Sequence, residues 1–175
     1  AMAYTFLHAA GESIGESLLE EDMVSTARSL LEESANSSTE IVLPTDHQCA
    51  ERIEANAKVR ICELGIPKGW MGLDIGPESL AVFNSKLDQA KTVLWNGPMG
   101  VFEMESFNKG TKAIAEYVAE ATRNGAFSLI GGGDSAAAVN KFGYTDQVSY
   151  VSTGGGALLE HMEGKVLPGV AALAE

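Results

Sequence analysis

The 175-residue sequence is poor in cysteine and contains no long apolar run. Cys49 and Cys62 are the only cysteines, and neither lies in a CxxC motif or a zinc-type cluster, so we interpret both as reduced thiols. No apolar stretch approaches the length of about 18 residues that suggests a membrane-spanning helix, so we expect no membrane partner. The N-terminus also lacks the basic and apolar pattern of a signal peptide. We therefore expect a cytoplasmic location, unless a leader has been removed upstream.

Positive charge is also scarce. The sequence has 12 Lys and Arg against 24 Asp and Glu, which gives a formal net charge of -12. A negative surface field repels a nucleic-acid backbone, so we expect no nucleic-acid partner. A small phosphorylated ligand is not excluded, because backbone amides at helix N-termini bind phosphate without any lysine.

The order of apolar patterns along the chain predicts an α/β fold. No repeat and no Pro/Gly/Ser-rich linker divides the sequence, so we read residues 1–175 as one unit. Short apolar runs alternate with helical patterns, as expected for a parallel sheet. The runs are uninterrupted, which favours strands covered on both faces. The strand candidates are Ile41 to Leu43, Thr92 to Trp95, Phe127 to Ile130 and Val148 to Val151.

Three segments have apolar residues at helical spacing, and we expect them to cover the sheet. They are marked by Met23, Ala27, Leu30 and Leu31, by Leu80, Phe83 and Leu87, and by Ile114, Tyr117, Val118 and Ala121. Pro77 suits the first turn of the second helix, and Pro168 marks a turn near the end. Residues 50–68 fit neither period, so we expect a loop with short strand pieces.

Three glycine-rich turns, at residues 96–103, 131–135 and 152–156, each follow a strand candidate. The carboxyl ends of parallel strands share one edge, so these turns are expected to face one cleft. Consecutive glycines allow positive φ angles and let backbone amides converge on an anion, and a following helix adds its dipole. The alternative is that the glycines only make tight turns. No turn matches a P-loop or a dinucleotide fingerprint.

Polar residues beside these turns have two interpretations each. Asp134 is either a helix N-cap or a magnesium contact, and Ser135 either caps the helix or donates to a phosphate oxygen. Glu103 either accepts hydrogen bonds from ribose hydroxyls or is only a surface residue. Gly72 would let a flat base approach the backbone, whereas Asp74 reads as a cap or turn residue. The histidines have no partner spacing and are read as structural or solvated: His8, His47 and His161.

Together, these stretches resemble the phosphoglycerate kinase family, specifically its C-terminal nucleotide-binding half. The resemblance covers essentially the whole chain and implies a three-layer αβα Rossmann-like parallel sheet. The matching blocks are MAYTFL from Met2, GIPKGWMGLDIGPES from Gly65, VLWNGPMGVFE from Val93, IGGGDSA from Ile130, VSTGGGALLE from Val151 and GKVLPGVAAL from Gly164.

The resemblance implies reversible phosphoryl transfer between 1,3-bisphosphoglycerate and ADP, giving 3-phosphoglycerate and Mg-ATP. It implies that Gly72 and Leu73 line the adenine pocket. It also implies that Asn96 and Pro98 contact the nucleotide and that Glu103 binds the ribose. The remaining roles concern phosphate and metal. The phosphates would be held by Gly132, Gly133, Asp134 and Ser135, and Asp134 would also contact the Mg²⁺ ion. The catalytic turn would steady the transferring phosphoryl group, and it consists of Gly154, Gly155 and Gly156. Ser135 departs from the family, which usually has threonine there.

The resemblance also implies missing parts. The acyl-phosphate domain, the lysine-bearing segment and the two glycines expected before Met2 are not in the sequence. We therefore expect an incomplete sheet that lacks the first strands of the domain, from a parent that is a monomer, and we expect the fragment to be inactive alone. A non-catalytic nucleotide-binding or interaction module is the alternative. An unrelated Rossmann-type dehydrogenase is disfavoured, because the first-turn fingerprint is absent.

Overall fold

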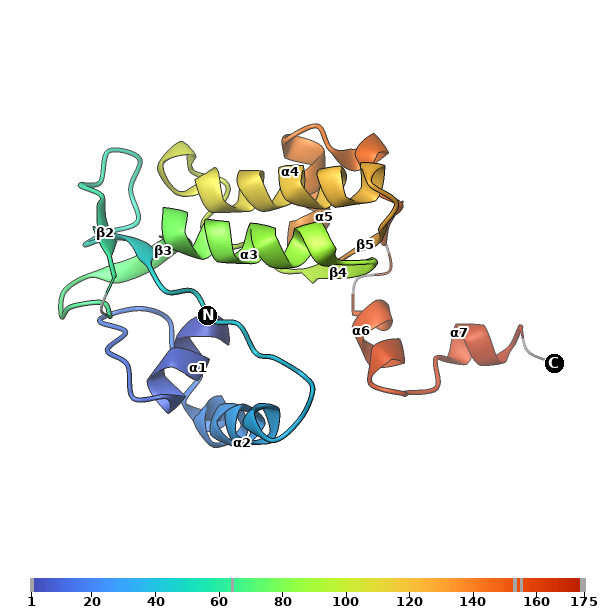
Figure 1. Cartoon of the computed structure of the whole chain (residues 1–175), viewed down its shortest axis with the longest axis horizontal. Coiled ribbons are helices and arrows are strands. Elements are labelled where there is room, and N and C mark those ends of the chain that lie inside the picture. The colour runs from blue at the N-terminus through green and yellow to red at the C-terminus, as the bar shows by residue number, and fades with distance from the viewer. Residues whose placement is uncertain (1, 64, 153, 155, 174–175) are drawn as a thin grey trace. The chain divides into compact units, whose positions relative to one another are not determined.

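The computed structural model describes residues 2–63, 65–152, 154 and 156–173 (Figure 1). They group into two compact units, Ala1–Asn84 with Met99–Thr111, and Ser85–Pro98 with Lys112–Glu175. Two helices run from one unit into the other, α3 (Pro77–Gln89) and α4 (Lys109–Arg123). Both helices were predicted, and Pro77 opens α3 as expected.

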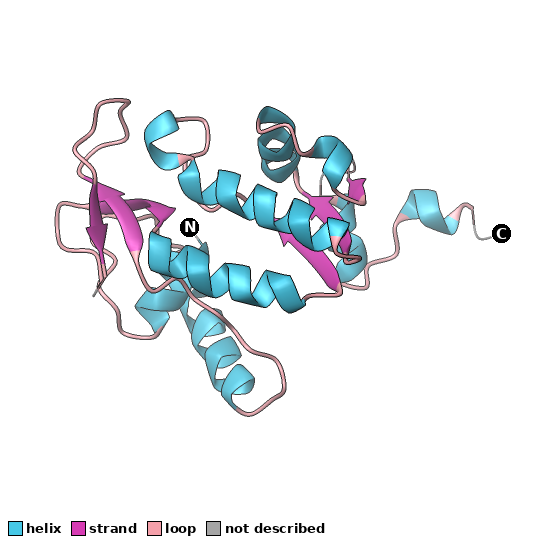
Figure 2. Cartoon of the chain, turned by 45° about the horizontal axis from the view of Figure 1, so that its top comes forward, coloured by secondary structure: helices cyan, strands magenta, loops and turns pink. Residues whose placement is uncertain are grey.

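An antiparallel sheet that the sequence did not predict lies in the first unit. Its order is β2-β1-β3, built from β1 (His47–Ala50), β2 (Arg60–Cys62) and β3 (Met71–Ile75). β1 pairs with both neighbours, and its register to β3 shifts between Gln48 and Cys49. Figure 2 shows these short strands beside long loops. β2 confirms the expected strand piece within residues 50–68.

Helices of the first unit flank the long loop that leads to β1. Helix α1 (Met2–Ala9) lies beside α2 (Val24–Ala35), as Figure 1 shows. Single 3-10 turns, η1 (Glu21–Met23) and η2 (Glu105–Phe107), complete the described helices of this unit. The helix predicted around Ala27 is confirmed, but Ala27 is the only residue of α2 that is buried.

The strand predicted at Ile41 to Leu43 is wrong. These residues are half-buried and have no strand pairing. Pro44 follows them, and a proline lacks an amide donor and restricts the residue before it. The Ile41 amide donates instead to the hydroxyl of Ser34, at 3.2 Å. A local side-chain hydrogen bond has therefore replaced a ladder partner.

A parallel sheet in the second unit confirms the predicted fold class. Its order is β4-β5-β6, from β4 (Thr92–Asn96), β5 (Phe127–Gly131) and β6 (Tyr150–Val151). Helices α4 and α5 (Gly133–Lys141) lie on one side of it and α6 (Ala157–Met162) on the other (Figure 1). The turn η3 (Thr145–Gln147) and helix α7 (Pro168–Ala171) complete the described elements. Pro168, expected in a turn, instead opens α7.

β6 begins later than predicted. Val148 and Ser149 precede it, and Ser149 exchanges two hydrogen bonds with Ser128 of β5. The Ser128 amide donates to the Ser149 hydroxyl at 3.0 Å, and the Ser149 amide donates to the Ser128 hydroxyl at 2.9 Å. Side-chain hydroxyls thus take the place of backbone acceptors at the start of this strand.

One face of the parallel sheet is only partly covered, whereas the sequence prediction favoured strands covered on both faces. β4 alternates between exposed and buried residues. Val93, Trp95 and Ile130 are buried on one face, towards the side of α4, where the Thr122 hydroxyl hydrogen-bonds that of Ser128 at 2.7 Å. The opposite face exposes large apolar side chains: Leu94, 40% exposed; Phe127, 53% exposed; and Tyr150, 59% exposed.

Candidate functional site

Two of the predicted glycine turns meet at the carboxyl ends of β4 and β5. Asn96 pairs with Gly131 in the parallel ladder. Gly97 has a φ of +98°, and its amide donates to the hydroxyl of Ser135 at 2.6 Å. Gly132 has a φ of +83°, and a Cβ there would lie 2.4 Å from Oδ1 of Asn96. Glycine is therefore required at Gly132 by both conformation and space.

Asp134 lies in the first turn of α5 and is exposed. The N-cap is Gly132, with no side-chain cap hydrogen bond, so the N-cap interpretation of Asp134 is wrong. Gly133 is also exposed. Ser135, by contrast, is fully buried. Amides in a first helical turn have no intrahelical partner and lie at the positive end of the dipole, so this turn suits an anion.

The third glycine turn has a different conformation. Gly156 precedes α6 with a φ of -68°, and Gly154 is exposed with its amide donating to the hydroxyl of Ser152 at 3.3 Å. Gly155 lies outside the described residues. Among the described glycines of the second and third clusters, only Gly132 has a positive φ. The expected run of positive φ angles is therefore not found in these residues.

Gly72 and Leu73 lie on β3 in the first unit. A Cβ at Gly72 would lie 2.1 Å from the hydroxyl of Tyr4, so the missing side chain makes room for Tyr4. Leu73 is 6% exposed and packs against Ala50 and Phe107 in the core. Its carbonyl accepts the amide of Val101 at 2.8 Å. That hydrogen bond ties β3 to the turn that carries Glu103.

Asp74 is fully buried beside this junction, which sequence reasoning missed. Its carboxylate accepts the amides of Gly110 at 2.8 Å and of Ile75 at 2.9 Å. Burial raises the pKa of Asp74 to about 6, although those hydrogen bonds oppose the shift. A Cβ at Gly100 or Gly110 would lie 2.5 Å or less from the carboxylate. The only signal in the sequence was a carboxylate between Leu73 and Ile75, two apolar strand residues.

Glu103 is exposed and lines a cavity of about 470 Å³ in the first unit. The other lining residues are Ala55, Asn56, Met104, Glu105 and Ser106. The Ser106 hydroxyl donates to the Ala55 carbonyl at 2.9 Å, which fixes one wall. This cavity gives Glu103 and Asn56 access to a polar ligand, such as one with hydroxyl groups.

Pro98 and Asn96 lie in the second unit with the α5 turn, whereas Gly72, Leu73 and Glu103 lie in the first. The structure therefore brings together Asn96, Gly132 and Ser135, and separately joins Leu73 to the turn before Glu103.

A protein-only metal centre is not found among the described residues, since none of them form a group of three or more metal-ligating side chains. Asp134 is the carboxylate at the α5 turn. Mg²⁺ bound to nucleotide phosphates keeps several waters and takes only one or two carboxylates. Asp134, exposed in the first turn of α5, is available for such a contact. Of the three histidines, His8 and His161 are exposed and His47 is buried.

A comparison with known protein families identifies the family of this chain. The model of the family described as phosphoglycerate kinase matches residues 1–165. The chain belongs to the phosphoglycerate kinase family. The phosphoglycerate kinase of Thermosipho africanus is 53% identical over 176 residues, which cover 99% of this chain and 44% of that protein. The cytosolic phosphoglycerate kinase of Triticum aestivum is 52% identical over 175 residues, which cover 99% of this chain and 44% of that protein.

Solved phosphoglycerate kinases share the fold. The structure from Coxiella burnetii has a TM-score of 0.90 at 43% identity, covering 94% of this chain and 42% of that one. The structure from Pyrococcus horikoshii has a TM-score of 0.83 at 30% identity, covering 98% of this chain and 43% of that one. The chain thus spans less than half the length of these phosphoglycerate kinases. No helix in the described part is long and apolar enough to cross a membrane.

Proposed function

We propose that the full-length protein containing this chain, here called the parent protein, is a glycolytic phosphoglycerate kinase. It transfers a phosphoryl group between the carboxyl group of 3-phosphoglycerate and ADP, so that 1,3-bisphosphoglycerate and ADP give 3-phosphoglycerate and ATP. This chain supplies the Mg²⁺-ADP/ATP site. The triose substrate binds to a part of the parent outside this chain. We propose that the parent is a cytoplasmic monomer, without a nucleic-acid partner.

The observation that carries the proposal is the turn at Gly132. Its positive φ opens the first turn of α5 directly beyond β5, and Asn96 lies against it from β4. Phosphates approach such a turn through free first-turn amides, and the dipole of α5 favours their charge. Membership of the phosphoglycerate kinase family supports the proposal that these phosphates belong to a nucleotide.

We assign the phosphate and metal contacts to residues around the first turn of α5. Gly132, Gly133 and Ser135 shape the phosphate turn, and Asp134 holds the Mg²⁺ ion, which neutralises charge on the phosphate oxygens when bound. Asn96 and Pro98 contact the nucleotide beside this turn. Ser135 acts through Gly97, because its buried hydroxyl already accepts the Gly97 amide.

We assign the adenine base and the ribose to the residues of the first unit. Gly72 and Leu73 form the adenine wall, with Leu73 contributing through its backbone because its side chain is in the core. Glu103 accepts the ribose hydroxyls from its place on the cavity wall.

Catalysis in this reaction rests on positioning and electrostatics. The attacking and leaving oxygens must lie roughly in line with the transferring phosphorus. Hydrogen-bond donors must also surround the three equatorial oxygens of the phosphoryl group. We assign the catalytic donors to Gly154, Gly155 and Gly156. Holding both reactants in reacting geometry contributes roughly 7 to 11 kcal/mol to such a step. The chain alone therefore lacks the contribution of the acceptor site.

A coupled assay tests the proposal. The parent protein is expected to form ATP from 1,3-bisphosphoglycerate, ADP and Mg²⁺, and the 175-residue chain alone is expected to show no measurable turnover. The alternative, a nucleotide-binding or interaction module, predicts ADP binding by calorimetry with no turnover in the parent either. Turnover by the isolated chain would contradict the proposal that the triose substrate binds to a part of the parent outside this chain.

A further inference from the structure

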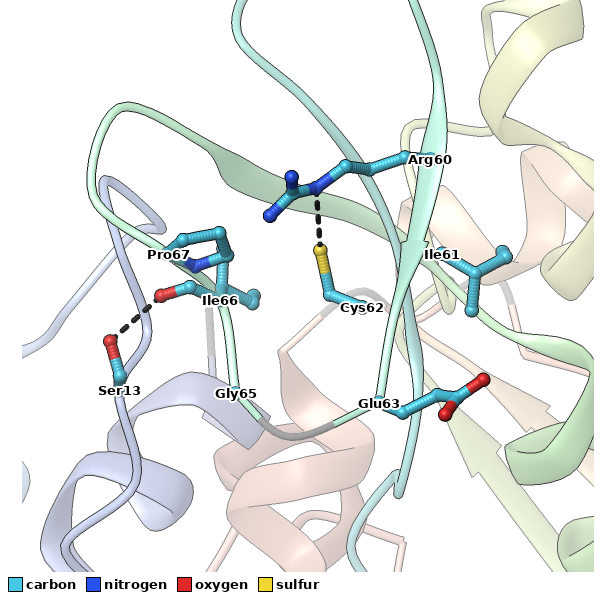
Figure 3. Close-up of a pocket in the computed structure, with 8 residues that line it drawn as sticks. All are labelled: Ser13, Arg60, Ile61, Cys62, Glu63, Gly65, Ile66 and Pro67. Carbon is cyan, nitrogen blue, oxygen red and sulfur yellow. Dashed lines mark hydrogen bonds between the residues drawn. The ribbon is translucent and has the colours of Figure 1, made fainter.

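Cys62 lines a pocket of the first unit, and Cys49 is buried in the same cluster with it; neither residue has a role in the site described above. The pocket has a volume of about 460 Å³ and is open to solvent. Figure 3 shows Cys62 between Arg60 and Ile66 at this pocket. The described lining residues are Ser13, Arg60, Ile61, Cys62, Glu63, Gly65, Ile66 and Pro67.

The strand register brings the two thiols to the same face of one ladder. Cys49 pairs with Arg60 and His47 pairs with Cys62, so Cys49 and Cys62 are diagonal neighbours on β1 and β2. Both belong to one buried cluster with Ile66. Cys49 is fully buried, whereas Cys62 is 6% exposed and lines the pocket. A reagent in the pocket therefore reaches Cys62 first.

Arg60 makes Cys62 the more reactive sulfur. Its Nε donates a hydrogen bond to Sγ of Cys62 at 3.3 Å. The same guanidinium lies over the ring of Trp70, 4.3 Å from the ring centroid, which holds it in place. A cation that donates to a sulfur stabilises the negative charge that develops there during nucleophilic attack.

Cys49 has the opposite character. Burial, followed by a hydrogen bond with Cys62, raises the pKa of the Cys49 thiol well above its ordinary value. It stays protonated and shielded until Cys62 has reacted. The neighbouring His47 is buried, its pKa is lowered by desolvation, and its Nδ1 has no hydrogen-bond partner among the described residues. This pair thus has one thiol on the pocket wall, which accepts a hydrogen bond from a guanidinium, and one fully buried thiol beside it.

We propose that Cys62 and Cys49 form a two-cysteine oxidation site for hydroperoxides, in which Cys62 reacts first and Cys49 resolves it as a disulfide. This proposal does not depend on the proposed kinase function.

The chemistry balances with one hydroperoxide. Cys62 loses its proton, its sulfur attacks the outer peroxide oxygen, and the O–O bond breaks. The leaving alkoxide takes up that proton as an alcohol, and Cys62 becomes a sulfenic acid. The Cys49 sulfur then bonds to the Cys62 sulfur. The sulfenic hydroxyl leaves with the Cys49 proton as water, so two thiols are oxidised by two electrons and the peroxide is reduced.

Closing the disulfide needs only a local movement. Diagonal partners in an antiparallel ladder lie about 7 to 8 Å apart at their Cα atoms, just beyond the roughly 7 Å that a disulfide spans, so the backbone has to move slightly. β2 is three residues long and lies at the edge of its sheet, paired on one side by β1. It can therefore shift towards Cys49 without breaking the β1–β3 pairing.

The test is peptide mapping after oxidation. The parent protein is treated with hydrogen peroxide, its remaining thiols are alkylated, and it is digested with trypsin. Cleavage after Arg28, Arg52, Arg60 and Lys68 places the two cysteines in separate peptides, residues 29–52 and 61–68. We expect these peptides to be joined, with a mass two hydrogens below their sum, and to separate on treatment with dithiothreitol.

Variants assign the order of events. In Cys49→Ser, and in Cys49→Ala as a second form of the same test, dimedone should trap a sulfenic acid on Cys62. In Cys62→Ser, dimedone should not label Cys49. Arg60→Gln should slow oxidation of Cys62 about tenfold, because the charge-assisted hydrogen bond is lost, and Arg60→Lys should slow it less.

The wild-type experiment does not depend on any variant folding. Unlinked peptides after full oxidation of Cys62 would overturn the disulfide. A link between two molecules, shown by a dimer on non-reducing electrophoresis, would also overturn it. Dimedone on Cys49 in Cys62→Ser, with native circular dichroism, would overturn the assignment of Cys62 as the first sulfur.

Discussion

The hydroxyl of Ser135 accepts a hydrogen bond from the amide of Gly97, at 2.6 Å. This contact joins the first turn of α5 to the turn after β4. Since Ser135 is fully buried, its hydroxyl supports the Asn96 turn.

Ser135→Ala should lower the free energy of unfolding by about 1 to 2 kcal/mol, because the Gly97 amide loses its partner. It should also weaken ADP binding, since the Asn96 turn loses its support. Ser135→Thr is the matched control, because it keeps the hydroxyl, and we expect a smaller loss. Urea denaturation and ADP titration of the parent protein measure both effects. Equal losses in both variants would mean that packing, not the hydrogen bond, is what matters.

Gly132→Ala should destabilise the parent by about 1 to 3 kcal/mol from the backbone conformation alone, which has φ 83° and ψ 146°, with a further loss from the contact with Asn96. Gly133→Ala is the control for stability, because Gly133 begins α5 and its Cβ would meet no atom within 4 Å. Thermal unfolding compares the two. If Gly132→Ala is as stable as Gly133→Ala, the turn does not require a glycine.

Asp74 should make the protein less stable as pH rises through the acid range. Its pKa is raised from 3.8 to about 6 in the folded state, so the folded protein binds more protons between these values. The stabilisation is complete below about pH 4 and is lost as pH approaches 6, by up to about 3 kcal/mol. Asp74→Asn should remove this fall.

Urea denaturation from pH 4 to pH 7 checks the effect of Asp74. Exposed Asp134 provides the matched control, and Asp134→Asn should keep the fall in stability that Asp74→Asn removes. If the free energy of unfolding changed with pH between pH 4 and pH 6 in the same way in wild type and in Asp74→Asn, the role of this carboxyl group would be contradicted.

The sequence predicted the parallel part of the fold well, for a physical reason. β4 and β5 are apolar runs, α4 has a clear apolar stripe, and a proline opens α3, so each element is set by its own residues. The antiparallel sheet was not predicted, and β2 was expected only as an unplaced strand piece, because His47–Ala50 and Arg60–Cys62 are short and mixed in polarity. Their partners come from distant parts of the chain, which no local pattern contains.

The candidate site was predicted in part. The positions of the glycine turns after β4 and β5 follow from the glycine clusters after apolar runs, and Gly132 has the positive φ that such a cluster permits; phosphate binding there stays a prediction. The burial of Asp74 and Leu73 could not be predicted, because it depends on packing by residues far away in sequence, such as Ala50 and Gly110. The exposure of Leu94 likewise depends on what covers a sheet face, not on the strand itself.

The most direct test of the account is the turnover of Asp134→Ala in the parent protein, measured by a coupled assay over a Mg²⁺ titration. Asp134 is exposed, so we expect its loss to leave the unfolding free energy within about 0.5 kcal/mol of wild type. Loss of the metal contact should lower kcat about 100-fold or more at saturating ADP. Near-normal turnover with unchanged Mg²⁺ dependence in the folded variant would contradict the nucleotide and metal site proposed at this turn.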